Sequence, residues 1–322
     1  MMRYAVGSDL GGTNIATAVI DETGKVLGKA KLPTEADKGP EHVIANIMRS
    51  IDMALADASM KIEDMVGIGL GIPGLMDIEK GISLFAGNLG WKNVEVIKPF
   101  KERYGLPTFM DNDVRVATLA EWKYGAGKGV NNLICVTLGT GIGSGLVFEG
   151  KLLRGVTNSV GEIGHVTVEK DGLICNCGNQ GCVEMYASGT GQARMARLMI
   201  QSGHFSIMTK MVGGDLSKIN SKIIQDAYDE GDTVAIQVMN KTAMYLGIAL
   251  ADYINLVNPE LVIIGGGVSL AGERLMKPLR EEVYRRVMIV PRQIVKIVRS
   301  ELGDESGMIG AAALAFERQG II

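Results

Sequence analysis

One histidine and three cysteines of this chain lie close enough in sequence to form a metal site. They are His165, Cys175, Cys177 and Cys182, in the stretch HVTVEKDGLICNCGNQGC. Zn²⁺ is bound in proteins by thiolate and imidazole, and three cysteines with one histidine fill all four positions around a tetrahedral ion. Because a filled site leaves no position for water, these residues predict a structural zinc rather than a catalytic one.

Disulfide bonds and plain buried thiols are the alternatives for these cysteines. The chain has four cysteines in 322 residues, which is too few to staple a large domain, and disulfides are dense in small secreted domains. Cys135 lies in the apolar run LICVTLG, where a small buried hydrophobic residue is expected. The clustering of the other three favours a metal, with zinc as the ion.

Acidic residues flank the predicted metal site, which indicates that the metal holds a binding surface in shape. Glu162 precedes His165 by three residues, and Glu184 follows the last cysteine by two. A further polar group, Asn112 and Asp113, lies at the start of DNDVRVATLAEWKYG, which has good N-cap residues and ends in glycine. This stretch predicts a helix with the two residues at its N-terminus, and on this pattern alone Asp113 is a helix cap.

Three glycine-rich turns are candidate phosphate sites. They are DLGGTN at residues 9–14, LGTGIGSG at 138–145 and GGG at 265–267. The first lacks the glycine–lysine pair of a Walker A loop and also fails the dinucleotide fingerprint. Such turns can direct backbone N–H groups at an anion, although one alone is more often a plain hairpin. Three together, with Asp9 placed to hold Mg²⁺ through water, predict a nucleotide gripped between two domains.

Charge and hydropathy exclude several classes of protein. The formal net charge is −3 and the pI is about 5.8, so no basic surface is expected for nucleic acid. The N-terminus lacks the pattern of a signal peptide, and no apolar stretch is expected to reach the length that spans a bilayer. We therefore expect a cytoplasmic protein that binds neither nucleic acid nor membrane.

Alternating strands and helices are expected to position these residues. Three antiparallel strands are predicted for residues 3–32, and the plan of strand, glycine turn and further strands repeats at 132–154, with Leu10 aligned on Leu138. The repeat predicts two domains of one topology. Other apolar patterns predict the remaining elements: strands at 65–74, 107–110, 260–267 and 293–298, and helices at 40–58, 113–125, 183–201, within 233–256, at 270–288 and at 306–319.

Five motifs along the chain resemble those of the sugar kinases of the ROK family, within the actin and hexokinase-like ATPase superfamily. DLGGTN is similar to the superfamily's first phosphate motif, LGTGIGSG to its second and IIGGG to its adenosine motif, while GEIGH and CNCGNQGCVE are similar to the family's own signature. The resemblance implies an α/β fold of two ribonuclease H-like/actin-like ATPase domains of hexokinase type, flanking a cleft. The expected division is a small N-terminal α/β domain at 1–112, joined by the C-terminal helix at about 306–322, and a large C-terminal α/β domain at 113–305 with the zinc loop.

The resemblance also implies roles for individual residues. Asp113 would be the catalytic base of an ATP-dependent phosphorylation, and the ring of His165 would bridge the zinc and a sugar hydroxyl. The sugar would be bound by Asn88, Asn112, Asp113, Glu162, His165 and Glu184. ATP and Mg²⁺ would be bound near Asp9, Gly11, Gly12, Thr13, Asn14, Gly139, Thr140, Gly141, Gly265, Gly266 and Gly267.

Proteins that share most of these motifs differ in function. Glucose is the favoured hexose, although kinases of N-acetylmannosamine, fructose and allose share most of the motifs. Kinases that use polyphosphate as the phosphate donor share the core motifs. A transcriptional repressor of the same family would have a helix-turn-helix before the first strand, for which a strand that starts at about residue 3 leaves no room. A silent sugar-binding protein would have lost the base or the phosphate turns. A homodimer or higher homo-oligomer is what the family suggests.

Overall fold

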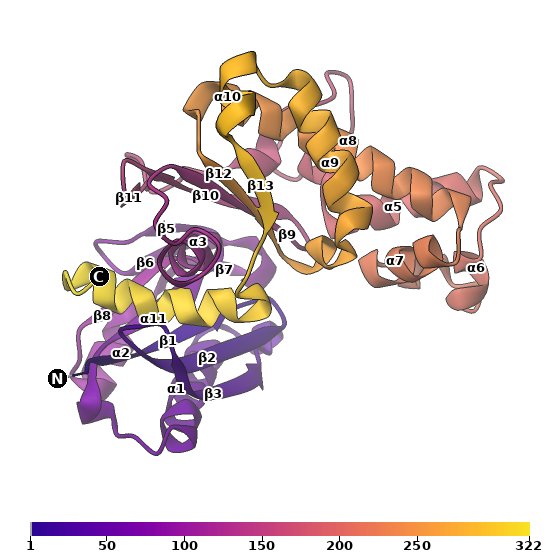
Figure 1. The fold of residues 1–322 in the computed structure, drawn as a ribbon. Coiled ribbons are helices and arrows are strands. Elements are labelled where there is room, and N and C mark those ends of the chain that lie inside the picture. Colours follow the sequence, from indigo (N-terminus) through magenta and orange to yellow (C-terminus); the bar gives the residue numbers. More distant parts are fainter. Residues whose placement is uncertain (1) are drawn as a thin grey trace. The chain divides into compact units, whose positions relative to one another are not determined.

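The first three strands pair as neighbours, as the sequence predicts. In the computed structural model, which describes residues 2–322, β1 (Tyr4–Leu10) pairs antiparallel with β2 (Asn14–Asp21), and β2 with β3 (Val26–Pro33). β4 (Met65–Ile72) and β8 (Thr108–Asn112) extend the sheet in parallel, in the order β3-β2-β1-β4-β8. The carboxyl ends of β1, β4 and β8 therefore meet at one edge of this sheet (Figure 1).

A second five-stranded sheet repeats this topology. Its order is β11-β10-β9-β12-β13. It is built from β9 (Leu133–Leu138), β10 (Ile142–Phe148), β11 (Lys151–Leu152), β12 (Leu261–Gly265) and β13 (Lys296–Arg299). Leu10 and Leu138 end the corresponding strands β1 and β9, and a glycine turn follows each. The repeat that the sequence predicts is therefore confirmed in the strand order.

Helices cover both faces of the first sheet (Figure 1). On one face, Val6 and Val19 share a buried apolar cluster with Ile47 and Ile51 of α1 (Pro40–Asp57). On the other face, residues one position away in β1 and β2, such as Ala5 and Ala18, belong to a separate cluster with α11 (Ser306–Arg318). This division follows from the alternation of side chains along a strand.

The last helix, α11, lies unusually close to the sheet and to α3 (Asp113–Tyr124). A Cβ added to Gly7 would lie 2.0 Å from the backbone nitrogen of Ala312, and one added to Gly310 would lie 1.7 Å from the carbonyl oxygen of Val116 in α3. No side chain fits at these two contacts. Glycine is therefore required where the backbones of β1, α11 and α3 pack together.

The structure divides into two units at positions that differ from the predicted domains. Unit 1 holds the residues up to Asn131, Gly145–Val160 and Glu301–Ile322, and unit 2 holds Asn132–Ser144 and Gly161–Ser300. The sequence placed the boundary near residue 113, at the start of α3. In the structure α3 belongs to unit 1, because it packs along α11 through the close contact at Gly310.

Unit 2 is mainly helical. Its helices include α5 (Gly189–Gln201), α7 (Ser221–Asp229), α8 (Thr233–Val257) and α9 (Glu273–Arg286). The expectation that no apolar stretch approaches the length of a bilayer was wrong for α8, which is long and apolar enough by length and composition. However, 61% of its apolar window is buried inside the protein, so α8 is a core helix.

Some elements differ from the sequence prediction or were not predicted. A three-stranded antiparallel sheet of β5 (Leu75–Asp77), β6 (Ile82–Ala86) and β7 (Trp91–Glu95) was not predicted, nor were α2 (Ile97–Tyr104) and α6 (Met208–Met211). The predicted helix at 183–201 is interrupted at Ser188, which separates α4 (Glu184–Ala187) from α5. The start of the strand predicted at 293–298 is instead the end of α10 (Ile289–Ile294).

Candidate active site

The four predicted metal ligands converge in unit 2. The ligand atoms of His165, Cys175, Cys177 and Cys182 all lie within 4.8 Å of one another. The Sγ of Cys175 is 3.7 Å from Nδ1 of His165, and the Sγ atoms of Cys177 and Cys182 are also 3.7 Å apart. A tetrahedral Zn²⁺ with Zn–S bonds of about 2.3 Å separates its sulfurs by about 3.8 Å. The donor set and spacing therefore fit this ion, and none of the three thiols forms a disulfide.

Backbone contacts fold the cysteine loop around this cluster. Cys175 N–H donates to the carbonyl of Asn179 at 2.8 Å, and the side-chain amide of Asn179 donates to the carbonyl of His165 at 3.3 Å. Gly178, between them, has φ +91°, which an L side chain adopts only with strain. Burial raises the pKa of the Cys182 thiol to about 12, so a cation is needed to hold this sulfur as a thiolate.

His165 presents its two ring nitrogens to different partners. Nδ1 faces the thiol cluster, whereas Nε2 lies 4.0 Å from Oε2 of Glu162. A ligand histidine commonly engages a carboxylate or another polar group with its second nitrogen, which fixes the ring orientation. The loop that carries the predicted metal ligands therefore orients the polar side chains of His165 and Glu162.

Glu184 connects the cysteine loop to the second glycine turn. Its Oε2 accepts from the backbone N–H of Ile142 at 2.9 Å, and a Cβ added to Gly141 would lie 2.3 Å from the same oxygen. Glu184 is also the first residue of α4, two positions after Cys182. A side chain at position 141 would displace the carboxylate. Glu184 is therefore held against this turn by the N–H of Ile142 and by the space at Gly141.

The second and third glycine turns lie together in unit 2. The carbonyl of Gly139 accepts from Gly189 N–H at 2.8 Å, and that of Thr140 accepts from the Thr190 hydroxyl at 2.6 Å. Gly266 has φ +80°, and a Cβ there would lie 2.5 Å from the carbonyl oxygen of Leu138. Gly265 ends β12 and Gly267 begins a short 3-10 helix. The sequence motifs assigned to phosphate and adenosine are therefore neighbours.

The first glycine turn lies in unit 1 beside Asn88. A Cβ added to Gly12 would lie 3.5 Å from Nδ2 of Asn88. The carbonyls of Gly11 and Thr13 accept from the hydroxyl and the backbone N–H of Thr34, at 2.7 and 2.8 Å. Asn14 begins β2, and its carbonyl accepts from Gly11 N–H at 2.9 Å. Thr34 thus fixes the turn by donating to two of the turn's backbone carbonyl groups.

Asp9 and Asp113 both lie close to Gly71. A Cβ added to Gly71 would lie 3.2 Å from Oδ1 of Asp9 and 3.6 Å from Cα of Asp113. Burial, together with the nearby charge of Asp113, raises the pKa of Asp9 to about 7. The shift reflects the partly buried position and the unfavourable interaction between the charges of two nearby carboxylates.

Replacement of Asp9 by asparagine is expected to stabilise the protein at high pH. The carboxyl of Asp9 has a higher pKa in the folded chain than in the unfolded chain, where it is near 3.8. The folded state therefore binds the extra proton between about pH 4 and pH 7, and its stability falls as the pH rises through that window. At about 1.4 kcal/mol per unit of pKa difference, Asp9→Asn should gain on the order of 1–3 kcal/mol at pH 8.

This prediction is checked by thermal denaturation of both proteins in Mg²⁺-free buffer from pH 5 to pH 8. The melting temperature of Asp9→Asn should exceed that of the unaltered protein by a few °C at pH 8, with a clearly smaller gain at pH 5. A difference that does not vary with pH would contradict the argument.

The structure places Asn112 and Asp113 at the start of α3, as predicted. Asn112 is the N-cap, and its Oδ1 accepts from the backbone N–H groups of Val114 and Arg115 at 3.0 and 3.3 Å. Asp113 is the first helical residue, and its Oδ1 accepts from Val114 N–H at 2.9 Å. Asn112 is therefore the N-cap of α3, and Asp113 contacts the same first turn.

A buried ionic cluster behind Asn112 was not singled out from the sequence. Asp111, the residue before Asn112, binds both Arg115 and Arg154. The spacing of Asp111 and Arg115 could have indicated their contact, since an acidic and a basic residue four positions apart at the start of a helix often interact. Nothing in the sequence indicated Arg154, which lies 43 residues away from Asp111.

Comparison with known proteins assigns the chain to a family. The model of the ROK family matches residues 5–318. The chain belongs to the ROK family. A glucokinase of Thermotoga maritima is 39% identical over 98% of this chain and 98% of its own length. A glucokinase of Halalkalibacterium halodurans is 36% identical over 98% of this chain and 96% of its own length.

Solved structures of ROK proteins share the fold. The crystal structure of a ROK family glucokinase from Streptomyces griseus, in complex with glucose and AMPPNP, matches with a TM-score of 0.86 and 34% identity. The match covers 99% of this chain and 100% of that chain. The predicted α/β fold class of hexokinase type is therefore confirmed.

Proposed function

We propose that this chain is an ATP-dependent glucokinase that converts glucose to glucose 6-phosphate. The observation that carries the proposal is the ring of His165, whose Nδ1 faces the thiol cluster and whose Nε2 faces Glu162. A metal loop that orients acceptor groups suits a ligand covered with hydroxyl groups. Full-length similarity to glucokinases supports glucose as that ligand.

The proposed sugar-binding residues are donors and acceptors of the kind that a hexose needs. Carboxylates and amides fix a ring of hydroxyls through directional hydrogen bonds, so their positions select one sugar over another. By their match to the family's motifs, these residues are Asn88, Asn112, Asp113, Glu162, His165 and Glu184.

Asp113 acts as the catalytic base in this proposal. Its carboxylate accepts a hydrogen bond from the attacking hydroxyl and takes the proton as the bond to phosphorus forms. The position at the N-terminus of α3 favours the ionised carboxylate, because the helix dipole is positive there. Phosphoryl transfer relies mainly on alignment and charge neutralisation, so one carboxylate suffices for the proton.

The glycine turns are proposed to bind ATP through backbone N–H groups. In the turns at 9–14 and 138–145, carbonyl oxygens are bound by donors of the protein, namely Thr34, Gly189 and Thr190. The N–H groups of Gly11, Gly139 and Ile142 donate within the protein, and other N–H groups of the turns are proposed to bind phosphate oxygens. Mg²⁺, held near Asp9, would neutralise phosphate charge when bound.

The thiol cluster is proposed to hold a structural Zn²⁺. All four positions would be filled by protein ligands, so the ion supplies no open site for catalysis. Its role is to fix the loop that presents Glu162 and His165. Reduced thiols of this kind suit the cytoplasm, where we place the enzyme, as a homodimer or higher homo-oligomer.

An ADP-release assay across a panel of sugars tests the proposed reaction. With ATP and Mg²⁺, glucose should give a kcat/KM at least about tenfold above those of N-acetylmannosamine, fructose and allose, because an unpaired polar group in a sugar site costs more than 1 kcal/mol. Release of ADP only in the presence of sugar separates a kinase from a sugar sensor.

The same assay can also compare phosphate donors. Polyphosphate in place of ATP, with direct detection of glucose 6-phosphate, ranks the phosphate donors. A preference for another hexose would change the assigned substrate, and no turnover with any hexose would contradict a kinase.

A further inference from the structure

The residue before the proposed sugar-binding pair, Asp111, is a completely buried carboxylate. It ends β8 next to Asn112, and its exposed fraction is 0%. Its Oδ1 accepts from Nε of Arg115 at 2.5 Å and from the backbone N–H of Asn112 at 2.8 Å. Its Oδ2 accepts from Nε of Arg154 at 2.7 Å. Both oxygens of Asp111 are therefore engaged.

These contacts lie on both sides of Asp113 in the sequence. Through one oxygen, Asp111 binds the backbone of Asn112, which precedes Asp113, and the side chain of Arg115, which follows it by two residues. The turn from β8 into α3 is thus closed by a ring of contacts that has Asp113 in its middle. Rotation of the Asp111 side chain would release both ends of this turn.

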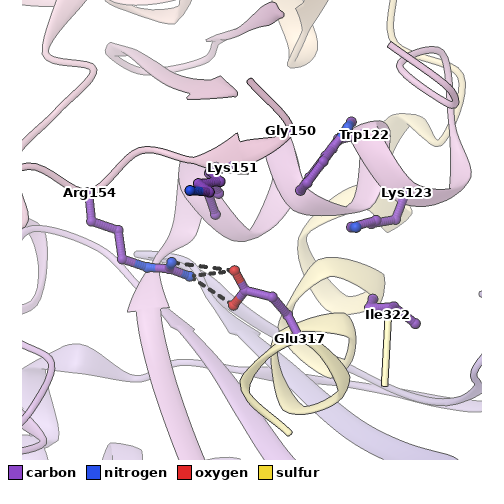
Figure 2. Close-up of a pocket in the computed structure, with 8 residues that line it drawn as sticks. Trp122, Lys123, Gly150, Lys151, Arg154, Glu317 and Ile322 are labelled. Carbon is purple, nitrogen blue, oxygen red and sulfur yellow. Dashed lines mark hydrogen bonds and ion pairs between the residues drawn. The ribbon is translucent and has the colours of Figure 1, made fainter. Parts of the chain in front are cut away.

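Arg154 is the part of the cluster that comes from outside the β8–α3 turn. Its Nε binds Asp111, and its terminal nitrogens donate to Glu317 of α11 at 3.0 to 3.4 Å. Figure 2 shows the guanidinium facing the carboxylate of Glu317, at the wall of a cavity of about 340 Å³ that Trp122 and Lys123 also line. Arg154 therefore fixes the Oδ2 side of Asp111 relative to α11.

Stability alone does not account for this cluster. Two carboxylates and two guanidiniums balance in charge, but Asp111 and Arg115 are 1% and 3% exposed in their side chains, and desolvation of such ions offsets most of their attraction. One terminal nitrogen of Arg115 is buried without a hydrogen-bond partner among the described residues. Apolar side chains would fill the same space at no such cost, so a requirement for geometry is the better explanation.

We propose that Arg154 is a positioning residue for Asp113, acting through Asp111. This inference rests on the proposed function, in which Asp113 is the catalytic base. Arg154 holds Asp111 in the one rotamer that closes the β8–α3 turn, and the turn holds the Asp113 carboxylate in line with the attacking hydroxyl. A displacement of about 1 Å at a reacting group costs up to about a hundredfold in rate.

Steady-state kinetics of Arg154→Met test the proposal. The variant keeps an unbranched side chain, which is shorter and uncharged, and loses both ion pairs. We expect kcat for glucose phosphorylation to fall about tenfold to a hundredfold, with KM for ATP within about twofold of the unaltered enzyme. Arg154→Lys, which keeps a cation for Asp111, should restore kcat to within about threefold, as expected of a smaller displacement.

Arg318→Met is the matched control, because Arg318 is also in unit 1 and pairs with Glu79 at the surface. Its kcat should be unchanged. A kcat of Arg154→Met within twofold of the unaltered enzyme would overturn the proposal. So would a loss that disappears when rates are divided by the folded fraction, measured by thermal denaturation, because a purely structural role would lower only the amount of active enzyme.

Asp113→Asn separates failure of this inference from failure of the proposed function. If Asp113→Asn keeps its turnover, the assignment of the base is wrong and the positioning argument falls with it. If Asp113→Asn is inactive while Arg154→Met turns over normally, the base stands and only the positioning role is overturned.

Discussion

Asp113→Ala is expected to lower kcat for glucose phosphorylation by about 10²–10⁴-fold, the usual contribution of a general base. Glucose binding should remain measurable, because the other proposed sugar-binding residues are unchanged. The site explains the size of the effect, since Asp113 is held at the first turn of α3 by its own contact with Val114 N–H. Coupled assay of ADP release gives kcat, and calorimetry gives the affinity for glucose.

Asparagine at the same position distinguishes a base from a helix cap. Asp113→Asn keeps an oxygen that accepts from Val114 N–H but cannot take a proton, so it should be as inactive as the alanine variant. Asp215→Ala is the control for loss of a cap, because Asp215 accepts from Ser217 N–H at the start of a 3-10 helix. Near-normal turnover of Asp113→Asn would assign Asp113 to capping.

Cys175→Ser is expected to release the bound metal and to weaken sugar affinity. Structural Zn²⁺ sites contribute on the order of 10 kcal/mol to the folding of small domains, and here the ion would hold the loop that carries His165. Zinc content should fall from one ion per chain toward zero. KM for glucose should rise at least about tenfold, because His165 and Glu162 lose their fixed orientation.

Metal analysis of the purified proteins, together with kinetics and thermal denaturation, checks this expectation. Cys135→Ala is the matched control, since Cys135 lies buried in β9 and outside the cluster. Its zinc content should stay unchanged. Full activity of the unaltered protein without zinc would contradict the structural role of the metal.

The repeated parts of the fold could be predicted from the sequence, and the irregular parts could not. Strong apolar periodicity and glycine turns mark β1 to β3 and their counterparts β9 and β10. The sheet of β5 to β7 has no such signal, because Leu75, Leu84 and Phe85 in it are exposed. The strand predicted at 293–298 starts too early, because Gln293 and Ile294 end α10, whose first turn tolerates Pro291.

In the candidate site, contacts between residues close in the sequence could be predicted, and contacts between distant residues could not. Ligands within eighteen residues, such as His165 and Cys182, are close because the loop is short, and Asn112 was placed by local capping rules. The contact of Glu184 with the turn at Gly141 depends on how α4 packs. The contact of Arg154 with Asp111 depends on tertiary structure as well, and no local rule could have found it.

The close packing of α11 against Gly7 and Gly310 has a consequence for how the protein is made. The first sheet emerges from the ribosome early, whereas the helix that covers one of its faces is encoded after all of unit 2. At about 5–20 residues per second, the stretch from residue 131 to 322 takes roughly 10–40 s to synthesise. During that time α11 does not yet cover Ala5, Ala18 and Ile20, so this apolar face of the first sheet stays partly exposed, and exposed apolar surface of this kind makes folding intermediates prone to aggregate.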